Sequence, residues 1–309
     1  MGLSPATRID THHHIVPDFY RRWLTDRGID AGGLPIPEWT IDGTRDLMSR
    51  CRIRTAIFSV STPGVEPAST AAEAASVARD LNTYCHEVVA SDPGHFGYFA
   101  TLTLPDVDHA IEEMNRAYDD LGADGVVLLA NSKGTYLGDP GFEPLMAELD
   151  RRAAVVFIHP SHLAGPAVDG IPAYAADFLL DTTRAALNLS RRGVLDRYPR
   201  IRFILSHGGG MIPYAALRLS PTASPTGNAV DGLRRLRRFY YDTALTPSPF
   251  SMPALLRMVP RSHLLFGSDY PYAAARYAAI FSGLLTAYPT LRHRAINHTN
   301  AERLFPRLA

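Results

Sequence analysis

Residues 155–160 read VVFIHP, an uninterrupted apolar run that ends in a histidine. A strand with apolar side chains on both faces must be covered on both faces, and such strands are typical of parallel sheets with helices on either side. Residues 126–129, VVLL, follow the same pattern. These two segments predict a buried parallel sheet with a polar side chain at the end of at least one strand.

Short apolar segments alternate with longer amphipathic segments along the chain, and the amphipathic segments have the spacing of helices that pack one face against a sheet. The expected strands are Arg8–His12, Arg54–Val60, Phe96–Leu102, Gly125–Ala130, Ala154–His159, Ile201–His207, Phe239–Thr243 and His263–Gly267. The expected helices include Ala68–Ala90, Val107–Leu121, Pro144–Arg152, Ala176–Leu195, Pro249–Met258 and Ala273–Ala287.

Eight parallel strands with interleaved helices predict one α/β domain over residues 1–309, a closed (β/α)8 TIM barrel. An open doubly wound sheet is the alternative, but it usually carries a glycine-rich phosphate loop after its first strand. The segment from about residue 17 to residue 42 is rich in Gly, Pro and Trp. The segment 221–232 is rich in Ser, Pro, Thr and Gly. We expect both to be loop insertions over the C-terminal face, because the alternation resumes in phase after each.

The overall composition argues against several classes of protein. The 309 residues have a formal net charge of zero, which gives no reason to expect nucleic acid or an acidic membrane surface as a partner. Two cysteines, Cys51 and Cys85, do not make a disulfide framework, and we expect buried thiols. The N-terminus lacks an apolar leader, and no apolar run approaches the length of a membrane span. We therefore expect a cytoplasmic enzyme.

A histidine cluster lies at the end of the first expected strand, where residues 10–14 read DTHHH. Alternate side chains of a strand share a face, so His12 and His14 point one way while His13 points the other way. Two imidazoles on one face of a strand end are a ready-made pair of ligands for a divalent metal ion.

Three further strands end in side chains of the same chemistry, namely His159, His207 and Asp269. Each has a plainer explanation when taken alone, such as a helix N-cap for Asp269. His207 precedes three glycines, which we expect to let the backbone approach a ligand closely. The C-terminal ends of barrel strands share one face, where active sites lie, so four coincidences are improbable. The pattern predicts a catalytic metal site with a coordination position open to water or substrate.

Six segments, spread over nearly the whole chain, carry a family resemblance: residues 10–14 (DTHHH), 157–160 (FIHP), 206–210 (SHGGG), 240–244 (YYDTA), 267–271 (GSDYP) and 300–305 (NAERLF). Through them the chain resembles the amidohydrolase superfamily. Within it, the chain looks like the branch of aminocarboxymuconate-semialdehyde decarboxylase and the salicylate- and resorcylate-type decarboxylases.

The resemblance implies that the metal ligands are His12, His14, His159 and Asp269. His207 is then the acid/base or substrate-polarising residue beside the ion. One divalent ion, Zn²⁺ or Mn²⁺, is expected, because strand four ends without the bridging lysine or glutamate of two-metal relatives, and Lys133 lies beyond it in a loop.

The same resemblance implies a metal-dependent, non-oxidative decarboxylase of a small aromatic or conjugated carboxylic acid, such as a hydroxybenzoate or methylsalicylate. Protonation of the ring carbon makes the ring an electron sink, and C–C cleavage then restores aromaticity. Asp269, a water on the ion and His207 are the candidate proton donors. The alternative enzyme is a metal-dependent hydrolase of a lactone or amide on the same scaffold. The non-enzymatic alternative is a barrel that only binds a metal or ligand.

Several other side chains are candidates for substrate contacts. Arg45 matches the position of a substrate-binding arginine in the muconate-semialdehyde relative, and a surface ion pair is its plainer explanation. Asp181 is expected to face the pocket or a neighbouring subunit. Trp23, Trp39 and Phe178 could form an apolar wall for a planar ring, or could belong to the core.

Asp242 ends the seventh expected strand and is expected to orient His207, although a loop-capping role fits the sequence equally well. The resemblance also implies a homodimer or homotetramer, with a small carboxylate as the other partner.

Overall fold

The computed structural model describes residues 7–163, 168–288 and 293–309. These residues form a curled sheet of seven strands in the order β1-β2-β3-β4-β7-β8-β9, and every neighbouring pair is parallel. The expected α/β architecture with a parallel sheet is thus confirmed. The strands are β1 Arg8–His14, β2 Ile53–Ser59, β3 Phe96–Thr101, β4 Gly125–Leu129, β7 Val155–His159, β8 Arg202–Leu205 and β9 Tyr240–Tyr241. A hairpin of β5 Asn131–Ser132 and β6 Thr135–Tyr136 follows β4.

The eighth expected strand, His263–Gly267, does not form a regular strand. Residues 264–270, which we call the bridging segment, make isolated parallel bridges to β9 and to β1 instead. Leu265 N donates to Tyr241 O of β9 at 2.9 Å, and Thr11 N of β1 donates to Phe266 O at 2.9 Å. The bridging segment therefore contacts both edge strands of the curled sheet.

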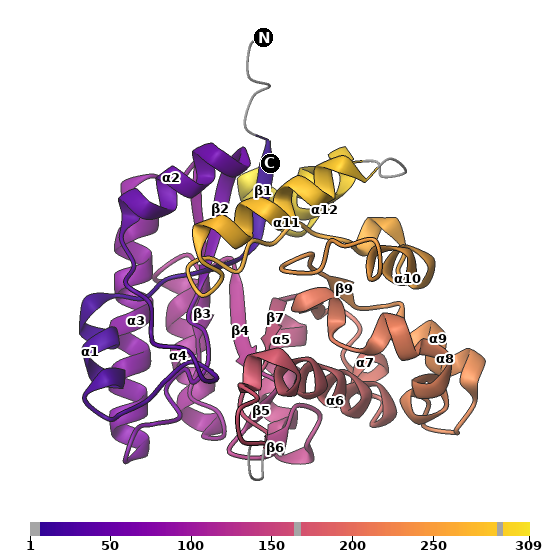
Figure 1. The fold of residues 1–309 in the computed structure, drawn as a ribbon. Helices are drawn as coiled ribbons and strands as arrows, with labels where there is room; N and C mark the ends of the chain where they lie inside the picture. Colours follow the sequence, from indigo (N-terminus) through magenta and orange to yellow (C-terminus); the bar gives the residue numbers. More distant parts are fainter. Residues whose placement is uncertain (1–6, 164–167, 289–292) are drawn as a thin grey trace.

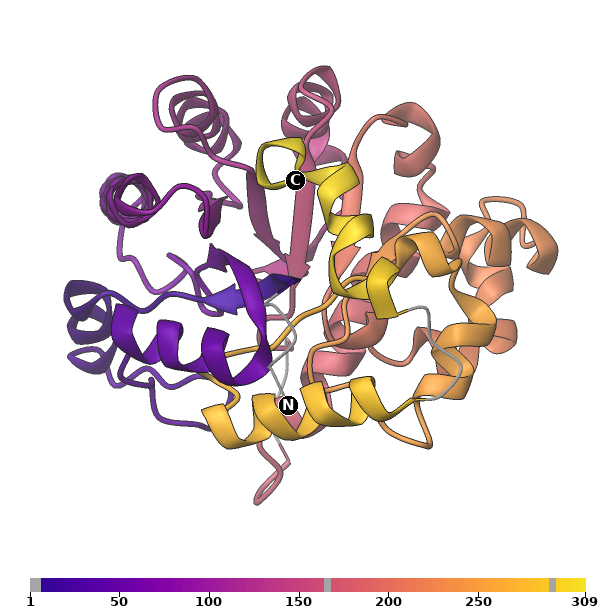
Figure 2. The ribbon, with the colours of Figure 1, turned by 90° about the horizontal axis from the view of Figure 1, so that it is seen from above.

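The helices surround the strands, as the view from above shows (Figure 2). All six expected helices are present, with shifted ends. The helices are α1 Asp18–Thr25, α2 Ile41–Cys51, α3 Ala71–Ser91, α4 Val107–Asp119, α5 Glu143–Arg151, α6 Asp177–Arg191, α7 Val194–Arg197, α8 Ile212–Ala223, α9 Ala229–Leu236, α10 Met252–Met258, α11 Ala275–Ala287 and α12 Asn300–Leu304. Within the described ranges, no helix is long and apolar enough to cross a lipid bilayer.

Capping residues explain where the helix ends differ from expectation. α3 begins at Ala71 rather than Ala68, because the Thr70 hydroxyl accepts the backbone N–H of Glu73 at 3.1 Å and the Glu73 carboxylate accepts the N–H of Ser69 at 2.7 Å. α6 ends at Arg191 because Gly193 adopts a left-handed conformation two residues later.

The expectation of loops over residues 17–42 and 221–232 is wrong in part. α1 lies within the first segment and α2 begins at its end, while the second segment contains the end of α8 and the start of α9. Thr40 caps α2 by accepting from Gly43 N at 3.0 Å, and Asn228 caps α9 by accepting from Asp231 N at 2.9 Å. Both N-cap residues lie in segments with the composition of loops, so the helices that they begin were not predicted.

The core has two layers, one between the strands and the surrounding helices and one inside the curled sheet. C-terminal residues complete the inner layer, and α12 lies beside β1 (Figure 1). Burying one large apolar side chain of this kind contributes roughly 1.5–3 kcal/mol. The inner layer consists of Ile9, Ile57, Phe99, Val127, Val155, Phe157, Ile204, Leu265, Ala301, Phe305 and Leu308. The ends of β1, β7 and β8 carry the histidines described next.

Candidate metal centre

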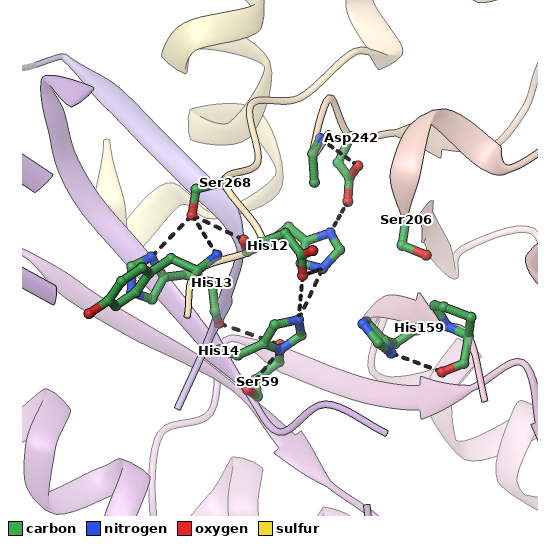
Figure 3. A network of polar contacts seen from close by, with 12 residues as sticks. His12, His13, His14, Ser59, His159, Ser206, Asp242 and Ser268 are labelled. Atoms are coloured by element: carbon green, nitrogen blue, oxygen red, sulfur yellow. Dashed lines mark hydrogen bonds and ion pairs between the residues drawn. The ribbon is translucent and has the colours of Figure 1, made fainter. Parts of the chain in front are cut away.

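β1 directs two imidazole rings towards one point. His12 and His14 are fully buried, and their Nε2 atoms lie 3.0 Å apart (Figure 3). Each Nε2 also lies 3.2 Å from Oδ1 of Asp269, which the bridging segment supplies. His13 points to the other side, where its ring contacts Asp10 at 3.0 Å. The alternation expected for a strand thus brings His12 and His14 together and removes His13.

The spacing of these three atoms fits a shared cation. Two donor atoms that each bind one ion at about 2.1 Å, with an angle of about 90–110° at the ion, lie roughly 3.0–3.4 Å apart. The three distances between His12 Nε2, His14 Nε2 and Asp269 Oδ1 are 3.0, 3.2 and 3.2 Å. Two imidazoles and a carboxylate are also a donor set that Zn²⁺ and other first-row divalent ions accept.

The other ring nitrogen of three of the histidines is tied to the protein. His12 and His159 face a carboxylate and a carbonyl oxygen, which can only accept, so Nδ1 of these two rings must carry a proton and Nε2 is the nitrogen left to face a cation. The three contacts are His12 Nδ1 to Asp242 Oδ2 at 2.6 Å, His14 Nδ1 to Ser59 O at 3.2 Å, and His159 Nδ1 to Pro160 O at 2.9 Å. His14 Nδ1 also lies 3.0 Å from the Ser59 hydroxyl, which can donate or accept.

His159 and His207 complete the cluster from β7 and from the turn after β8. The His159 ring centroid lies 4.9 Å from that of His14 and 5.4 Å from that of His12, and His207 lies 4.8 Å from His12. One ligand atom from each of His12, His159, His207 and Asp269 lies within 4.8 Å of the others. The structure therefore brings together all five residues that were predicted to form the site.

Two of these residues have unusual backbone conformations. His207 has φ of 51° and Asp269 has φ of 63°, in the left-handed region that residues other than glycine rarely adopt. Such conformations cost free energy and often occur where function requires a particular side-chain direction. Here they turn the chain away from the strand direction at the two points where His207 and Asp269 enter the site.

The glycines after His207 serve a different purpose from the one expected. A Cβ atom on Gly209 would overlap the ring of Tyr241, and a Cβ on Gly210 would overlap the carbonyl oxygen of Leu179. The expectation that these glycines admit a ligand is therefore wrong for Gly209 and Gly210. They let the turn after β8 pack closely against β9 and α6.

Burial makes most of these imidazoles neutral. It lowers the pKa of His14 to about 4, and it lowers the pKa values of His159 and His207 as well. A neutral imidazole with a free Nε2 is the form that binds metal ions, so these rings need not release a proton first.

The carboxylates act in the opposite direction. Burial by itself would lower the pKa of His12, but Asp242 and Asp269 outweigh burial and raise it to about 10. Burial would raise the pKa of Asp269, but hydrogen bonds from His12 and His14 hold it well below its usual range. The centre thus holds the ionised carboxylate of Asp269 in a buried place, where a divalent cation would compensate its charge.

Asp242 has a different partner from the one expected. It accepts the Nδ1–H of His12 (Figure 3) rather than orienting His207, because only the bridging segment separates the end of β9 from β1. The expected pairing of Asp242 with His207 is corrected to a pairing with His12. The loop-capping alternative is confirmed, because Asp242 Oδ1 accepts the N–H of Ala244 at 3.0 Å.

Asp10 is a site residue that received no role from the sequence. It is fully buried, its Oδ1 accepts the N–H of Ser268 at 3.0 Å and that of His12 at 3.2 Å, and its Oδ2 contacts His13 Nδ1 at 3.0 Å. It therefore joins β1 to the bridging segment. A carboxylate inside an otherwise buried strand requires donors, and that was the available signal.

Arg45 and Trp23 lie away from the cluster, and each has the plainer of its two expected roles, a surface ion pair for Arg45 and packing against the core for Trp23. Arg45 is half exposed on α2, 3.7 Å from Asp92 and over the ring of Phe96 at the start of β3, whereas the cluster lies at strand ends. Trp23 on α1 donates from Nε1 to Glu73 of α3 at 3.0 Å. α2 turns Arg45 outward and α1 packs Trp23 against Tyr20 in the core, which the local pattern could not distinguish from a turn towards the site.

The remaining candidates for substrate contacts, Trp39, Phe178 and Asp181, are buried and contact other residues of the chain. Trp39 is buried and donates from Nε1 to the hydroxyl of Thr44 at 2.9 Å. Phe178 at the start of α6 is buried, with its ring centroid 6.1 Å from that of His162, three residues beyond His159. Asp181 is fully buried, and both of its carboxylate oxygens accept hydrogen bonds from the protein. These contacts favour a structural role for Asp181 over direct binding of the substrate.

Comparisons with known proteins identify a family and several relatives of this chain. A family described as Amidohydrolase matches residues 9–307. A 6-methylsalicylic acid decarboxylase from Penicillium expansum is 37% identical over 315 residues, 97% of this chain and 97% of that protein. The crystal structure of an amidohydrolase II protein matches with a TM-score of 0.91 and 31% identity, over 97% of this chain and 99% of that chain.

A more distant structure shows the fold alone. This is 5-carboxyvanillate decarboxylase from Novosphingobium aromaticivorans, complexed with manganese and 4-hydroxy-3-methoxy-5-nitrobenzoic acid. It matches with a TM-score of 0.83 and 20% identity, over 97% of this chain and 96% of that chain.

Proposed function

The chain belongs to the amidohydrolase family, and on that premise we propose that it is a metal-dependent, non-oxidative decarboxylase of a small aromatic carboxylic acid. The substrate class is that of hydroxybenzoates and methylsalicylates. The observation that carries the reaction is the similarity, over nearly the full length of both chains, to an enzyme named 6-methylsalicylic acid decarboxylase.

The metal assignment is one divalent ion, Mn²⁺ or Zn²⁺, held by His12, His14, His159 and Asp269. Its support is the convergence of donor atoms with tied Nδ1 groups. Manganese in the structure of the 5-carboxyvanillate enzyme supports Mn²⁺ in particular. A single ion is supported by Lys133, which is exposed in the β5–β6 turn and is therefore not placed to bridge two metal ions.

When bound, the cation supplies Lewis acidity towards the carboxylate and hydroxyl oxygens of the substrate. His207 is the group proposed to move the proton to the ring carbon. Asp269 is held in its ionised form by His12 and His14 and is a poorer proton donor at neutral pH. Burial lowers the pKa of His207, which makes its protonated form a stronger acid, and a nearby substrate carboxylate favours that protonated form.

The scaffold assignment is a single (β/α)8 barrel domain in which the bridging segment takes the place of the eighth strand. Its support is the pair of bridges that this segment makes to β9 and β1. The site then lies at the C-terminal face, where barrel enzymes place their active sites. Phe178, near the end of β7, is proposed to form part of the apolar wall beside the substrate ring.

The homodimer or homotetramer and the cytoplasmic location stay predictions. Light scattering of the purified protein tests the oligomeric state.

A substrate panel tests the reaction. The metal-free protein, reloaded with Mn²⁺ or Zn²⁺, is incubated without oxygen with 6-methylsalicylate, 2,6-dihydroxybenzoate, an aryl lactone and an aryl amide. We expect one carbon dioxide for each phenol released from a hydroxybenzoate, and loss of that activity on chelation. Hydrolysis of the lactone or amide without carbon dioxide release would refute the decarboxylase assignment.

A further inference from the structure

One peptide group separates His159 from a buried carboxylate. The carbonyl oxygen of Pro160 accepts the Nδ1–H of His159 at 2.9 Å. The N–H of Ser161, which belongs to the same peptide group, donates to Oδ2 of Asp181 at 2.8 Å. His159, Ser161 and Asp181 are all at least 98% buried, so water does not compete for these bonds. Imidazole, peptide and carboxylate therefore form one continuous chain of hydrogen bonds.

A peptide group transmits polarisation between its two ends. Its C–N bond has partial double-bond character, so donation of its N–H to an anion increases the negative charge on its oxygen. Hydrogen bonds to ionised acceptors are also roughly twice as strong as neutral ones. The Pro160 oxygen thereby becomes a better acceptor for the His159 ring, and the Nε2 of that ring becomes a better donor to a cation.

Asp181 is itself held in place from a second element. Asn131 in β5 donates from Nδ2 to Oδ1 of Asp181 at 2.9 Å and to the carbonyl oxygen of His162 at 3.0 Å. The carboxylate on α6 is thus fixed at both oxygens, one by the hairpin after β4 and one by the segment after β7. Its direction relative to the Pro160–Ser161 peptide is determined by three elements.

We propose that Asp181 is a positioning residue for the metal ion, which acts on His159 through the Pro160–Ser161 peptide. It fixes the ring orientation and the Nδ1–H form of His159 and strengthens Nε2 as a ligand. The inference rests on the proposed metal site. His12 receives its carboxylate directly from Asp242, whereas His159 receives its carboxylate through a peptide.

Two substitutions test this role by metal affinity. Asp181→Asn keeps the size of the side chain and an oxygen that can accept from Ser161, but it removes the negative charge. Asp181→Ala removes the acceptor as well. We expect the dissociation constant for Mn²⁺, measured by competition with a chromogenic chelator, to rise about 10-fold in Asp181→Asn and about 100-fold in Asp181→Ala. The visible spectrum of the Co²⁺-loaded protein should change too, while kcat at saturating Mn²⁺ changes less than the affinity.

Asp124→Asn is the matched control. Asp124 is also a well-buried carboxylate, and it accepts the backbone N–H of Tyr98 in β3 at 3.0 Å and pairs with Arg307 at 2.8 Å. It touches none of the proposed ligands, so its replacement should lower the melting temperature and leave the Mn²⁺ affinity unchanged.

The outcomes separate the alternatives. Unchanged Mn²⁺ affinity in Asp181→Asn and Asp181→Ala, whatever their melting temperatures, would reduce Asp181 to a structural residue. An equal loss of affinity in Asp124→Asn would also overturn the inference. If Asp181→Ala does not fold, Asp181→Asn decides alone. A wild-type protein that binds neither Mn²⁺ nor Co²⁺ would instead refute the metal site, and with it the proposed function.

Discussion

β1 and the bridging segment both supply residues to the same centre, but they do so in different ways. β1 is seven residues long, fully buried and paired in parallel with β2; its register shifts between Asp10 and His13, but its alternation still places His12 and His14 side by side. The bridging segment is irregular, and Asp269 has a positive φ. Its place depends on β1, because Ser268 N donates to Asp10 and Asp269 N donates to His12 O at 2.8 Å.

The difference teaches that one half of the centre is built by local geometry and the other half by long-range hydrogen bonds. Damage to the anchors on β1 should therefore reach Asp269, whereas loss of the Asp269 side chain should leave the backbone of β1 in place. The following changes test this dependence.

Asp269→Ala should have the largest effect, because it removes the only carboxylate of the proposed ligand set. We expect the protein to fold, to lose the bound ion and to lose more than about 100-fold of its decarboxylase activity. Metal content after dialysis and carbon dioxide release measure the two losses. Full metal content with normal turnover would remove Asp269 from the centre.

His207→Ala should separate the proton donor from the ligands. We expect this variant to keep the ion and to lose roughly 10²–10⁴-fold in kcat, the range of a positioned acid or base. The same two assays apply, with His159→Ala as the comparison, which should lose ion and activity together. Loss of the ion from His207→Ala would make His207 a ligand and would call for a search for a second metal ion.

Asp10→Ala should break the connection between β1 and the bridging segment. Three donors, on Ser268, His12 and His13, lose their acceptor, and we expect the free energy of unfolding to fall by about 3 kcal/mol. Urea titration of the metal-free protein measures it. The metal affinity should fall as well, since Asp269 loses its anchor, and wild-type affinity in this variant would contradict the dependence of the bridging segment on β1.

Asp242→Asn should sharpen the comparison within β1, since it alters the partner of His12 and leaves His14 untouched. We expect Mn²⁺ affinity to fall about 10–100-fold, because the His12 ring loses the anion that fixes its Nδ1–H. Chelator competition measures the affinity. An unchanged value would show that the strand alone orients His12.

The smallest expected effect is on the pH dependence of the metal-free protein. Burial lowers the pKa of His14 from 6.5 to about 4, so the native ring is neutral where the unfolded ring is protonated, and stability is lost as pH falls from 6.5 to about 4. For His12, burial is outweighed by Asp242 and the pKa rises to about 10, so stability is lost as pH rises from 6.5 to about 10.

Urea midpoints across pH measure both limbs of this profile. His14→Gln should make the acid limb shallower, and Asp242→Asn should make the alkaline limb shallower. A His14→Gln profile that keeps the full acid slope would contradict the role of His14 burial.

Much of the fold was predictable from local patterns. The apolar runs at 126–129 and 155–158 form the expected buried strands β4 and β7, and the N-cap at Thr70 was visible in the sequence although the predicted start of α3 overlooked it. The bridging segment was not predictable as an irregular element, because its pairing depends on the position of β1, about 250 residues away along the chain (Thr11 to Phe266).

The proposed ligands were easier to predict than their supporting contacts. A histidine or aspartate at the end of an apolar strand is visible without tertiary information, and five such residues meet in the structure. The direction of a side chain on a surrounding helix is not visible in this way, which is why Arg45 was expected at the site and instead pairs with Asp92.

The amino-acid sequence by itself determined which residues could reach the strand ends, because a period of two separates His12 and His14 from His13 and because apolar strands must be covered on both faces. Only the tertiary structure decided which carboxylate supports which imidazole. Asp242 meets His12 across 230 residues, and Asp181 reaches His159 through a peptide group that no local pattern marks. A hydrogen bond depends on where two atoms lie in space, and that position follows from the packing of the whole sheet.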